Sequence, residues 1–203
     1  MTANESAWDQ RLQINTTGRD DLNSDQYRYP YEPTAYSVLQ RLADSGLIGE
    51  ADMVLDYGCG KGRVDFFLSH QTNAQTIGIE YDERIYSSAL ENQKTSNKEK
   101  KTSFILSNAE TYEVPACVNR CYFFNPFSAQ ILHTVMARIL ESYYAAPREI
   151  FLFFYYPSDE YVAYLMTVDE LDFYDEIPCQ DLFAGNDPRE RILIFSLPDY
   201  TTH

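Results

Sequence analysis

Three glycines at alternate positions constrain the fold of this chain more than any other feature of its sequence. Gly58, Gly60 and Gly62 directly follow the apolar stretch Met53–Asp56, and a helix is predicted to begin at Val64. Glycine permits positive φ angles and lets the backbone approach a ligand closely. A buried strand, a glycine turn and a helix in this order predict a ligand site at the carboxyl end of a parallel strand. On its own the turn is a weak indication, because structural turns also use glycine.

Apolar segments typical of strands alternate with segments of helical periodicity along the rest of the chain. The predicted strands cover residues 53–56, 76–80, 102–106, 121–124, 149–156, 173–177 and 191–197. One helix is predicted to start near residue 34, and further helices are predicted to cover residues 64–70, 83–92, 130–144 and 159–167. Such alternation predicts a parallel sheet covered on both faces, whereas the last two strands follow one another without a helix. We therefore expect an α/β, Rossmann-like, doubly wound and mostly parallel seven-stranded sheet with an antiparallel edge hairpin at the C-terminus.

The length of the chain and the polarity of its first residues indicate one domain with a short extension. A chain of 203 residues suits a single domain. Residues 1–26 are dominated by Asn, Asp, Ser and Thr and are predicted to form an N-terminal arm or lid. The aromatic loop Tyr29–Tyr36 comes next and is expected either to fold over a ligand or to fix the first helix to the core.

The charge and the cysteines disfavour several classes of partner. The formal net charge of −15 disfavours nucleic acid, because its binding draws much of its affinity from neutralised phosphates. Cys117 and Cys121 lie close together but have no further partners at zinc-site spacing, so no metal site is expected. The first twenty residues lack the apolar stretch of a signal peptide, and no long apolar run suggests a membrane span. These patterns predict a cytoplasmic protein and leave its oligomeric state open.

A carboxylate at the end of the next predicted strand sharpens the meaning of the glycine turn. Glu80 follows Gly62 by eighteen residues, and a carboxylate there can accept hydrogen bonds from both hydroxyls of a ribose. A nicotinamide dinucleotide site would use the pattern G-x-G-x-x-G. Arg63 stands where that pattern needs its third glycine. The spacing therefore favours a nucleoside ligand of another kind, and a solvated strand end is the alternative interpretation of Glu80.

Four segments resemble the motifs of class I S-adenosylmethionine-dependent methyltransferases. Val54–Arg63 is similar to their first motif and Gly78–Asp82 to their second. Ser107–Glu110 stands in the place of the third, and Phe123–Phe127 falls where the fourth ends a strand. The resemblance covers roughly residues 35–200 and makes residues 27–203 a single methyltransferase domain.

The resemblance implies S-adenosyl-L-methionine as cofactor and assigns it a set of contacts. The three glycines of the turn would pass under its methionine and ribose parts, and Asp56 would organise the turn and the amino group. Glu80 would hold the ribose hydroxyls, Tyr81 would pack on the adenine, and Asn108 with Ala109 would meet the adenine edge. The implied cofactor-binding residues are Asp56, Gly58, Gly60, Gly62, Glu80, Tyr81, Asn108 and Ala109.

The fourth motif carries the implied catalytic residues, Asn125, Pro126 and Phe127. They are similar to the [Asp/Asn]-Pro-Pro-[Tyr/Phe] motif of methyltransferases that modify amino or amide nitrogens, with one proline fewer. The resemblance implies that Asn125 and a backbone carbonyl accept hydrogen bonds from an NH2 group while the ring packs on the acceptor. A plain strand-ending turn is the alternative, since proline cannot continue a strand ladder.

These observations predict a methyltransferase that acts on a small-molecule or protein acceptor. A protein-based nucleophile is not required, because the cofactor brings the reactivity and the protein supplies alignment. His70 and His133 fall on predicted helices and are expected to be structural or exposed. Tyr155 and Tyr156, at the end of the fifth strand, are expected either to line an acceptor pocket or to fill the core. A non-catalytic nucleoside-binding module and a nicotinamide-dependent oxidoreductase remain the alternatives.

Overall fold

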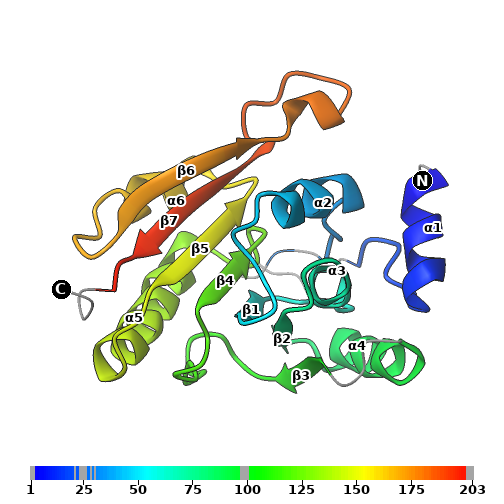
Figure 1. The fold of residues 1–203 in the computed structure, drawn as a ribbon, viewed down its shortest axis with the longest axis horizontal. Helices are drawn as coiled ribbons and strands as arrows, with labels where there is room; N and C mark the ends of the chain where they lie inside the picture. The colour runs from blue at the N-terminus through cyan, green and yellow to red at the C-terminus, as the bar shows by residue number, and fades with distance from the viewer. Residues whose placement is uncertain are drawn as a thin grey trace.

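The computed structural model describes residues 3–20, 22, 27, 29, 31–96 and 101–199, and the rest of the predicted arm and aromatic loop lies outside these residues. Seven strands form one sheet in the order β3-β2-β1-β4-β5-β7-β6 (Figure 1). The strands are β1 (Met53–Tyr57), β2 (Gln75–Glu80), β3 (Thr102–Leu106), β4 (Arg120–Phe123), β5 (Ile150–Tyr155), β6 (Asp172–Pro178) and β7 (Arg191–Leu197). The first five strands run parallel, whereas β7 pairs antiparallel with both β5 and β6. The predicted fold, including the C-terminal hairpin at the sheet edge, is confirmed.

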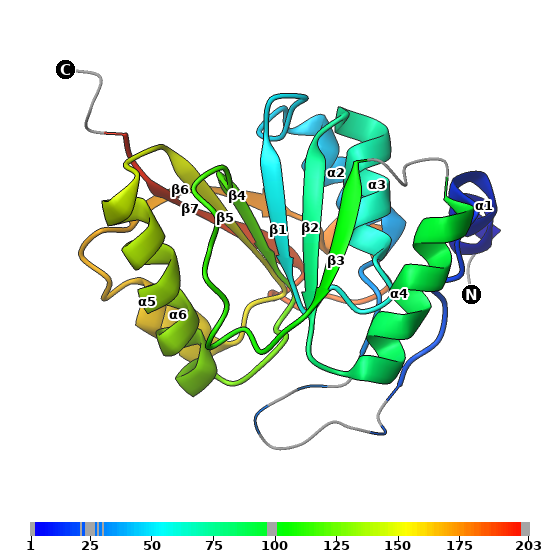
Figure 2. The same ribbon diagram turned by 90° about the horizontal axis from the view of Figure 1, so that it is seen from below.

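Six α-helices cover the two faces of this sheet. They are α1 (Ala3–Leu12), α2 (Tyr36–Asp44), α3 (Arg63–Thr72), α4 (Glu83–Thr95), α5 (Ala129–Ala145) and α6 (Asp159–Leu165), and a 3-10 turn, η1 (Gln180–Leu182), precedes β7. Helices α1 to α4 lie on one side and α5 with α6 on the other (Figure 2). No helix within the described residues is both long and apolar enough to cross a bilayer.

The core is divided by the sheet into two apolar layers. Neighbouring residues of one strand alternate between them: Phe153 packs in the layer under α2 and α3, and Phe154 in the layer under α5 and α6. Every residue of β5 is buried, as expected for a strand that is covered on both faces. This is why the central strands read as continuous apolar runs without polar alternation in the sequence.

Local side-chain contacts fix where the helices begin. The Asp82 carboxylate accepts a hydrogen bond from the Arg84 amide at the start of α4, and Ser128 does the same for Ile131 at the start of α5. Such caps satisfy amides that have no partner within the helix. Helix α4 thus begins just after the carboxyl end of β2, and helix α5 begins shortly after that of β4.

The N-terminal arm contains helix α1, which packs on the outside of the domain. The Trp8 ring meets the Phe67 ring of α3 edge-on, with 4.8 Å between their centroids. Past this helix the chain returns toward the sheet, and Asp20 and Tyr31 form an isolated antiparallel bridge. The arm thus crosses the end of the sheet at which β1 and β2 terminate.

Candidate functional site

A cavity opens where β1, β2 and β4 end, beside the point at which the strand order reverses. The residues that follow these strands and β3 form one part of its wall, and the arm before α2 forms the other. Lining residues include Tyr29, Tyr31, Asp56, Gly58, Glu80, Tyr81, Asn108, Ala109, Phe124, Pro126 and Phe127. Ligands of open α/β sheets bind in this crevice, so the site lies where the glycine turn predicts it.

Most residues that the sequence assigns to the cofactor reach this cavity. They are Asp56, Gly58, Glu80, Tyr81, Asn108 and Ala109. Gly60 and Gly62 are buried and do not line it. A Cβ atom on Gly62 would stand 2.5 Å from Cζ of Phe104 and 2.9 Å from Cε2 of Phe66. In this structure Gly62 therefore lets α3 pack closely on the sheet, and its contact with a cofactor stays a prediction.

Glu80 stands at the end of β2 and organises the glycine turn. Its Oε2 accepts a hydrogen bond of 3.0 Å from the Gly60 amide, and its Oε1 accepts bonds of 2.8 and 2.9 Å from the Tyr81 and Asp82 amides. Burial raises the pKa of this carboxyl even though the amides oppose the shift. A carboxylate can accept about four hydrogen bonds, so Glu80 keeps acceptor capacity for a ligand in the cavity.

Asp56 ends β1 and faces a second buried carboxyl group from α3. The two side chains interact with each other, and Asp65 also interacts with the Thr76 hydroxyl. Burial, and then the charge of Asp65, raise the pKa of Asp56 well above its ordinary value. Burial also raises the pKa of Asp65, to about 7. Two adjacent buried carboxyl groups cannot both ionise readily, so the pair retains a proton near neutral pH.

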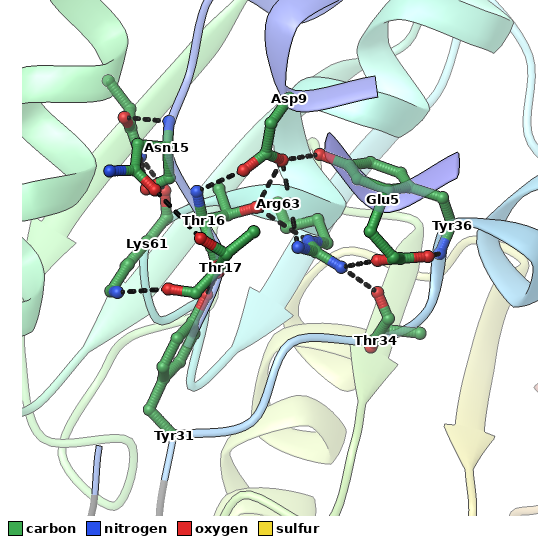
Figure 3. Close-up of polar contacts among 11 residues, drawn as sticks. Glu5, Asp9, Asn15, Thr16, Thr17, Tyr31, Thr34, Tyr36, Lys61 and Arg63 are labelled. Carbon is green, nitrogen blue, oxygen red and sulfur yellow. Dashed lines mark hydrogen bonds and ion pairs between the residues drawn. The ribbon is translucent and has the colours of Figure 1, made fainter. Parts of the chain in front are cut away.

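Tyr31 brings the arm onto the glycine turn. Its ring lies so close to Gly60 that a Cβ atom there would stand 2.1 Å from Cε2 of the tyrosine. The Tyr31 hydroxyl donates to the Thr16 carbonyl at 2.6 Å, and Lys61 Nζ donates to the Thr17 carbonyl at 2.9 Å (Figure 3). The turn is therefore held between β1 on one side and the arm on the other.

Arg63 is the centre of the contacts that hold the arm (Figure 3). Its side chain is 4% exposed and forms an ion pair with Glu5 of α1. Its Nε donates to Thr16 Oγ1 at 2.7 Å, and its Nη1 donates to the Thr34 carbonyl at 3.1 Å. Asp9 completes the cluster, with its Oδ1 at 3.8 Å from Nη2. The residue that departs from the dinucleotide pattern thus has a structural partner in the arm.

The fourth motif splits between two cavities. Pro126 and Phe127 line the first cavity, whereas Asn125 lines a second one. The Asn125 side chain donates from Nδ2 to the Tyr156 carbonyl and accepts at Oδ1 from the Ser158 amide at 3.3 Å. Both polar atoms of this amide thus bind the turn after β5. The predicted contact of Asn125 with an acceptor NH2 group stays a prediction, and here the side chain joins the ends of β4 and β5.

The second cavity adjoins the first and is lined mainly by rings. The two cavities share Tyr29, Glu32, Pro33 and Phe124. The second one adds Tyr155 and Tyr156, which the sequence offered as pocket or core residues, together with Arg19, Ala35, Asn125, Phe183 and Glu190. A ligand in either cavity would therefore lie against Phe124.

The two histidines of the predicted helices lie outside the cavities. His133 lies exposed on α5, stacked on Tyr164 with 3.6 Å between ring centroids. His70 is half-buried on α3 beside Trp8. Among the described residues, no three His, Cys, Asp or Glu side chains gather as metal ligands do. Neither histidine lines one of the two cavities.

Sequence comparison gives one partial relative. No family model matches the chain. A curated protein-lysine N-methyltransferase of Saccharolobus islandicus (strain REY15A) is 28% identical over 80 residues, which are 39% of this chain and 50% of that protein. The chain thus spans about half the length of the curated relative it matches.

Solved structures resemble the chain over more of its length. An RNA methyltransferase from Salinibacter ruber, in complex with S-adenosyl-L-homocysteine, has a TM-score of 0.54 at 14% identity, over 85% of this chain and 97% of that one. A TehB-like S-adenosylmethionine-dependent methyltransferase from Corynebacterium glutamicum gives 0.56 at 14% identity, over 77% and 86%. The human methyltransferase 10 domain containing protein gives 0.59 at 11% identity, over 96% and 94%. The chain therefore has the Rossmann-like fold of S-adenosylmethionine-dependent methyltransferases, as its four motifs predict.

Proposed function

We propose that the chain binds S-adenosyl-L-methionine in the first cavity and transfers its methyl group to a small-molecule or protein acceptor. The observation that carries the proposal is the pair of carboxyl groups, Asp56 and Glu80, that border one cavity beside the point where the strand order reverses. Support also comes from the fold, which is that of methyltransferases, and from the partial relative, which is a protein-lysine N-methyltransferase.

The charge of the first cavity suits a cationic ligand. The described lining residues include five acids: Asp20, Glu32, Asp56, Glu80 and Asp82. Asp20 and Asp82 pair with Arg84, and Glu32 pairs with Arg19, whereas Glu80 forms no ion pair with a described cation. The one basic residue of the lining is Arg63, which is engaged with α1. S-adenosylmethionine carries a sulfonium and an ammonium group, whereas a dinucleotide would bring an anionic pyrophosphate to these carboxylates. Coulomb attraction therefore favours the first ligand over the second.

Individual residues fit the parts of this ligand. Asp56 borders the place of its ammonium group, and the spare acceptor capacity of Glu80 is available to its ribose hydroxyls. The Tyr81 ring is 55% exposed at the rim, where it can pack on the adenine. Asn108 and Ala109 complete that end of the cavity.

When bound, the cofactor supplies an electrophilic methyl group. The acceptor atom would need a free lone pair to take this methyl group, so a protonated amine would first lose a proton to solvent. The electrons of the broken carbon–sulfur bond would stay on sulfur, and S-adenosylhomocysteine would be the second product. The chain would contribute orientation and exclusion of water, with Pro126, Phe127 and Phe124 bordering the first cavity on the β4 side.

The activity can be tested with S-adenosylmethionine and pools of small amines, amino acids and cell proteins, by following S-adenosylhomocysteine with mass spectrometry. We expect product above the enzyme-free background. Glu80→Gln should lower the rate by about tenfold or more, because it removes a charge-assisted acceptor from the ribose site.

Glu83→Gln is the matched control, since Glu83 is exposed in the first turn of α4 and lies outside both cavities. It should leave the rate unchanged. Equal rates for the wild type and Glu80→Gln would contradict the assignment of the ribose site. Cofactor binding without product from any pool would favour a non-catalytic module.

A further inference from the structure

We propose that the second cavity is the acceptor site and that it takes a primary amine at the end of an unbranched aliphatic chain. This inference rests on the proposed function and names the acceptor class for it. It is carried by the position of the cavity, by its uncompensated carboxylate and by its aromatic walls.

The position of the second cavity suits an acceptor. It shares Tyr29 and Phe124 with the first cavity and extends away from it along the ends of β4 and β5. An acceptor atom that passes Phe124 would arrive from the side opposite to the glycine turn. Asn125 fixes the two strand ends to each other, so the wall between the cavities is held in place by its amide.

The charge of the cavity lining favours a cation. Glu190 accepts a hydrogen bond of 2.7 Å from the Tyr155 hydroxyl and forms no ion pair with a described cation. The other charged lining residues, Glu32 and Arg19, pair with each other at 3.4 Å. The arginines on either side of Glu190 are also engaged, Arg189 with Asp187 at 2.8 Å and Arg191 with Glu176 at 3.1 Å. One negative charge of the lining therefore remains for a ligand to neutralise.

The aromatic walls suit both a cationic group and an aliphatic stem. The Phe124 centroid lies 4.7 Å from that of Tyr155 and 6.4 Å from that of Tyr156, whose ring meets Phe124 edge-on. Phe183 adds another ring. Ring faces attract ammonium groups, and their apolar surface covers methylenes. The Arg189 guanidinium lies 4.4 Å above the centroid of Tyr156 and takes one face of that ring, so the rings of Phe124, Tyr155 and Phe183 remain for a ligand.

The same features disfavour a nucleobase within RNA. An exocyclic base amine is uncharged and brings phosphates with it, and these would meet Glu190 in a chain of net charge −15, while the arginine of the lining, Arg19, is paired with Glu32. An aliphatic amine is mostly protonated near neutral pH, since its pKa is close to ~10.4. Both a free small amine and a lysine side chain of a protein have this chemistry.

Binding can be measured by calorimetry on the full chain saturated with S-adenosylhomocysteine. The probes are n-pentylamine and an acetylated Gly-Lys-Gly amide. Their neutral counterparts are n-pentanol and the same peptide with norleucine. We expect both amines to bind more tightly than their counterparts. Tighter binding of the peptide would identify a protein side chain as the source, and equal binding would identify a small amine.

Two variants locate this selectivity. Glu190→Gln should weaken amine binding by about tenfold, the loss expected when a charged hydrogen-bond partner becomes neutral. Phe183→Leu keeps apolar volume but removes a ring, and it should weaken binding about threefold. Glu113→Gln is the control, because Glu113 is exposed and lies outside both cavities. None of the three should change the affinity for S-adenosylhomocysteine.

The outcomes separate this inference from the proposed function. If S-adenosylhomocysteine binds but the amines bind no better than the neutral probes, the acceptor assignment is wrong and the proposed function stands. Preferential binding of a short RNA oligonucleotide would overturn the acceptor assignment as well. If S-adenosylhomocysteine itself does not bind, the proposed function fails, and this inference fails with it.

Discussion

The ring of Tyr31 lies directly against Gly60, at a place where any larger residue would overlap it. A Cβ atom on the glycine would stand 2.1 Å from Cε2 and 2.3 Å from Cδ2 of the tyrosine. The arm and the glycine turn, which are separate features in the sequence, therefore form one wall of the first cavity.

Gly60→Ala tests this contact. The substitution forces Tyr31 off the turn, and we expect it to lower both thermal stability and the affinity for S-adenosylhomocysteine, the latter by about tenfold or more. Gly46→Ala is the matched control, because Gly46 also has positive φ, +75° against +58°, and a Cβ there meets nothing within 4 Å. It should lower stability alone. Combining Gly60→Ala with Tyr31→Ala should recover part of the loss, and strictly additive effects would contradict the contact.

The Arg63 cluster should hold the arm to the domain. Arg63→Met leaves Glu5 and Asp9 without their cation, and breaking a buried ion pair costs about 3–5 kcal/mol. Hydrogen exchange should increase first in α1 and residues 13–20. Arg138→Met removes a surface pair with Glu141 and should change stability by about 0–1 kcal/mol. Unchanged exchange in α1 of the Arg63 variant would show that the arm is held by other contacts.

The buried carboxyl of Asp65 should make stability depend on pH. Burial raises its pKa from 3.8 to about 7, so the folded chain binds the extra proton between these values. Its stabilising contribution is complete below the unfolded pKa and is lost as pH rises through the folded pKa.

Asp65→Asn removes one of the two buried carboxyl groups and so reduces this dependence, and it should therefore raise Tm more at pH 8 than at pH 5. A difference of ~2 kcal/mol corresponds to about 4–8 °C for a chain of this size. Thermal unfolding followed by circular dichroism measures it. The same substitution at the exposed Asp169 is the control and should give no such gain. An equal shift of Tm at both pH values would mean that Asp65 does not hold a proton in the folded chain.

The Asn125 side chain should position the end of β4. Its φ is +38°, and its amide joins β4 to the turn after β5. Asn125→Ala loses both side-chain hydrogen bonds and leaves a residue with a Cβ atom at positive φ. Asn125→Gly loses the same hydrogen bonds, but glycine adopts a positive φ without steric strain. We expect Ala to be less stable than Gly by about 1 kcal/mol.

Both Asn125 variants should keep their affinity for S-adenosylhomocysteine within about twofold, since Asn125 does not line the first cavity. Both should weaken the binding of n-pentylamine, because the wall of the second cavity loses the hydrogen bonds that connect the ends of β4 and β5. Chemical denaturation and calorimetry separate the two effects. Loss of cofactor affinity with amine binding intact would contradict this division of roles.

The fold and the cofactor end of the site could be predicted because their signals are local. The glycine turn, the apolar strand ahead of it and the carboxylate that ends β2 each depend on a few neighbouring residues. The mostly parallel sheet follows from the alternation of strands and helices, and the antiparallel hairpin at its edge follows from the end of that alternation after α6. These features need no knowledge of distant contacts.

The remaining features depend on contacts between distant parts of the chain. Arg63 meets Glu5, which is 58 residues away, and nothing in the local sequence marks that pairing. Asp65 lies in the first turn of α3, and only the fold reveals that it faces Asp56. Glu190 and Phe183 reach the second cavity through the connection between β6 and β7. A residue-type pattern cannot show which of these groups share one cavity.

Calorimetry with S-adenosylhomocysteine is the most direct test of the central claim that the first cavity binds this class of nucleoside. We expect one molecule of S-adenosylhomocysteine to bind per chain, Glu80→Gln to weaken this binding by about tenfold or more, and NADH not to compete for the site. Absence of binding at millimolar ligand, or displacement of bound S-adenosylhomocysteine by NADH, would contradict it.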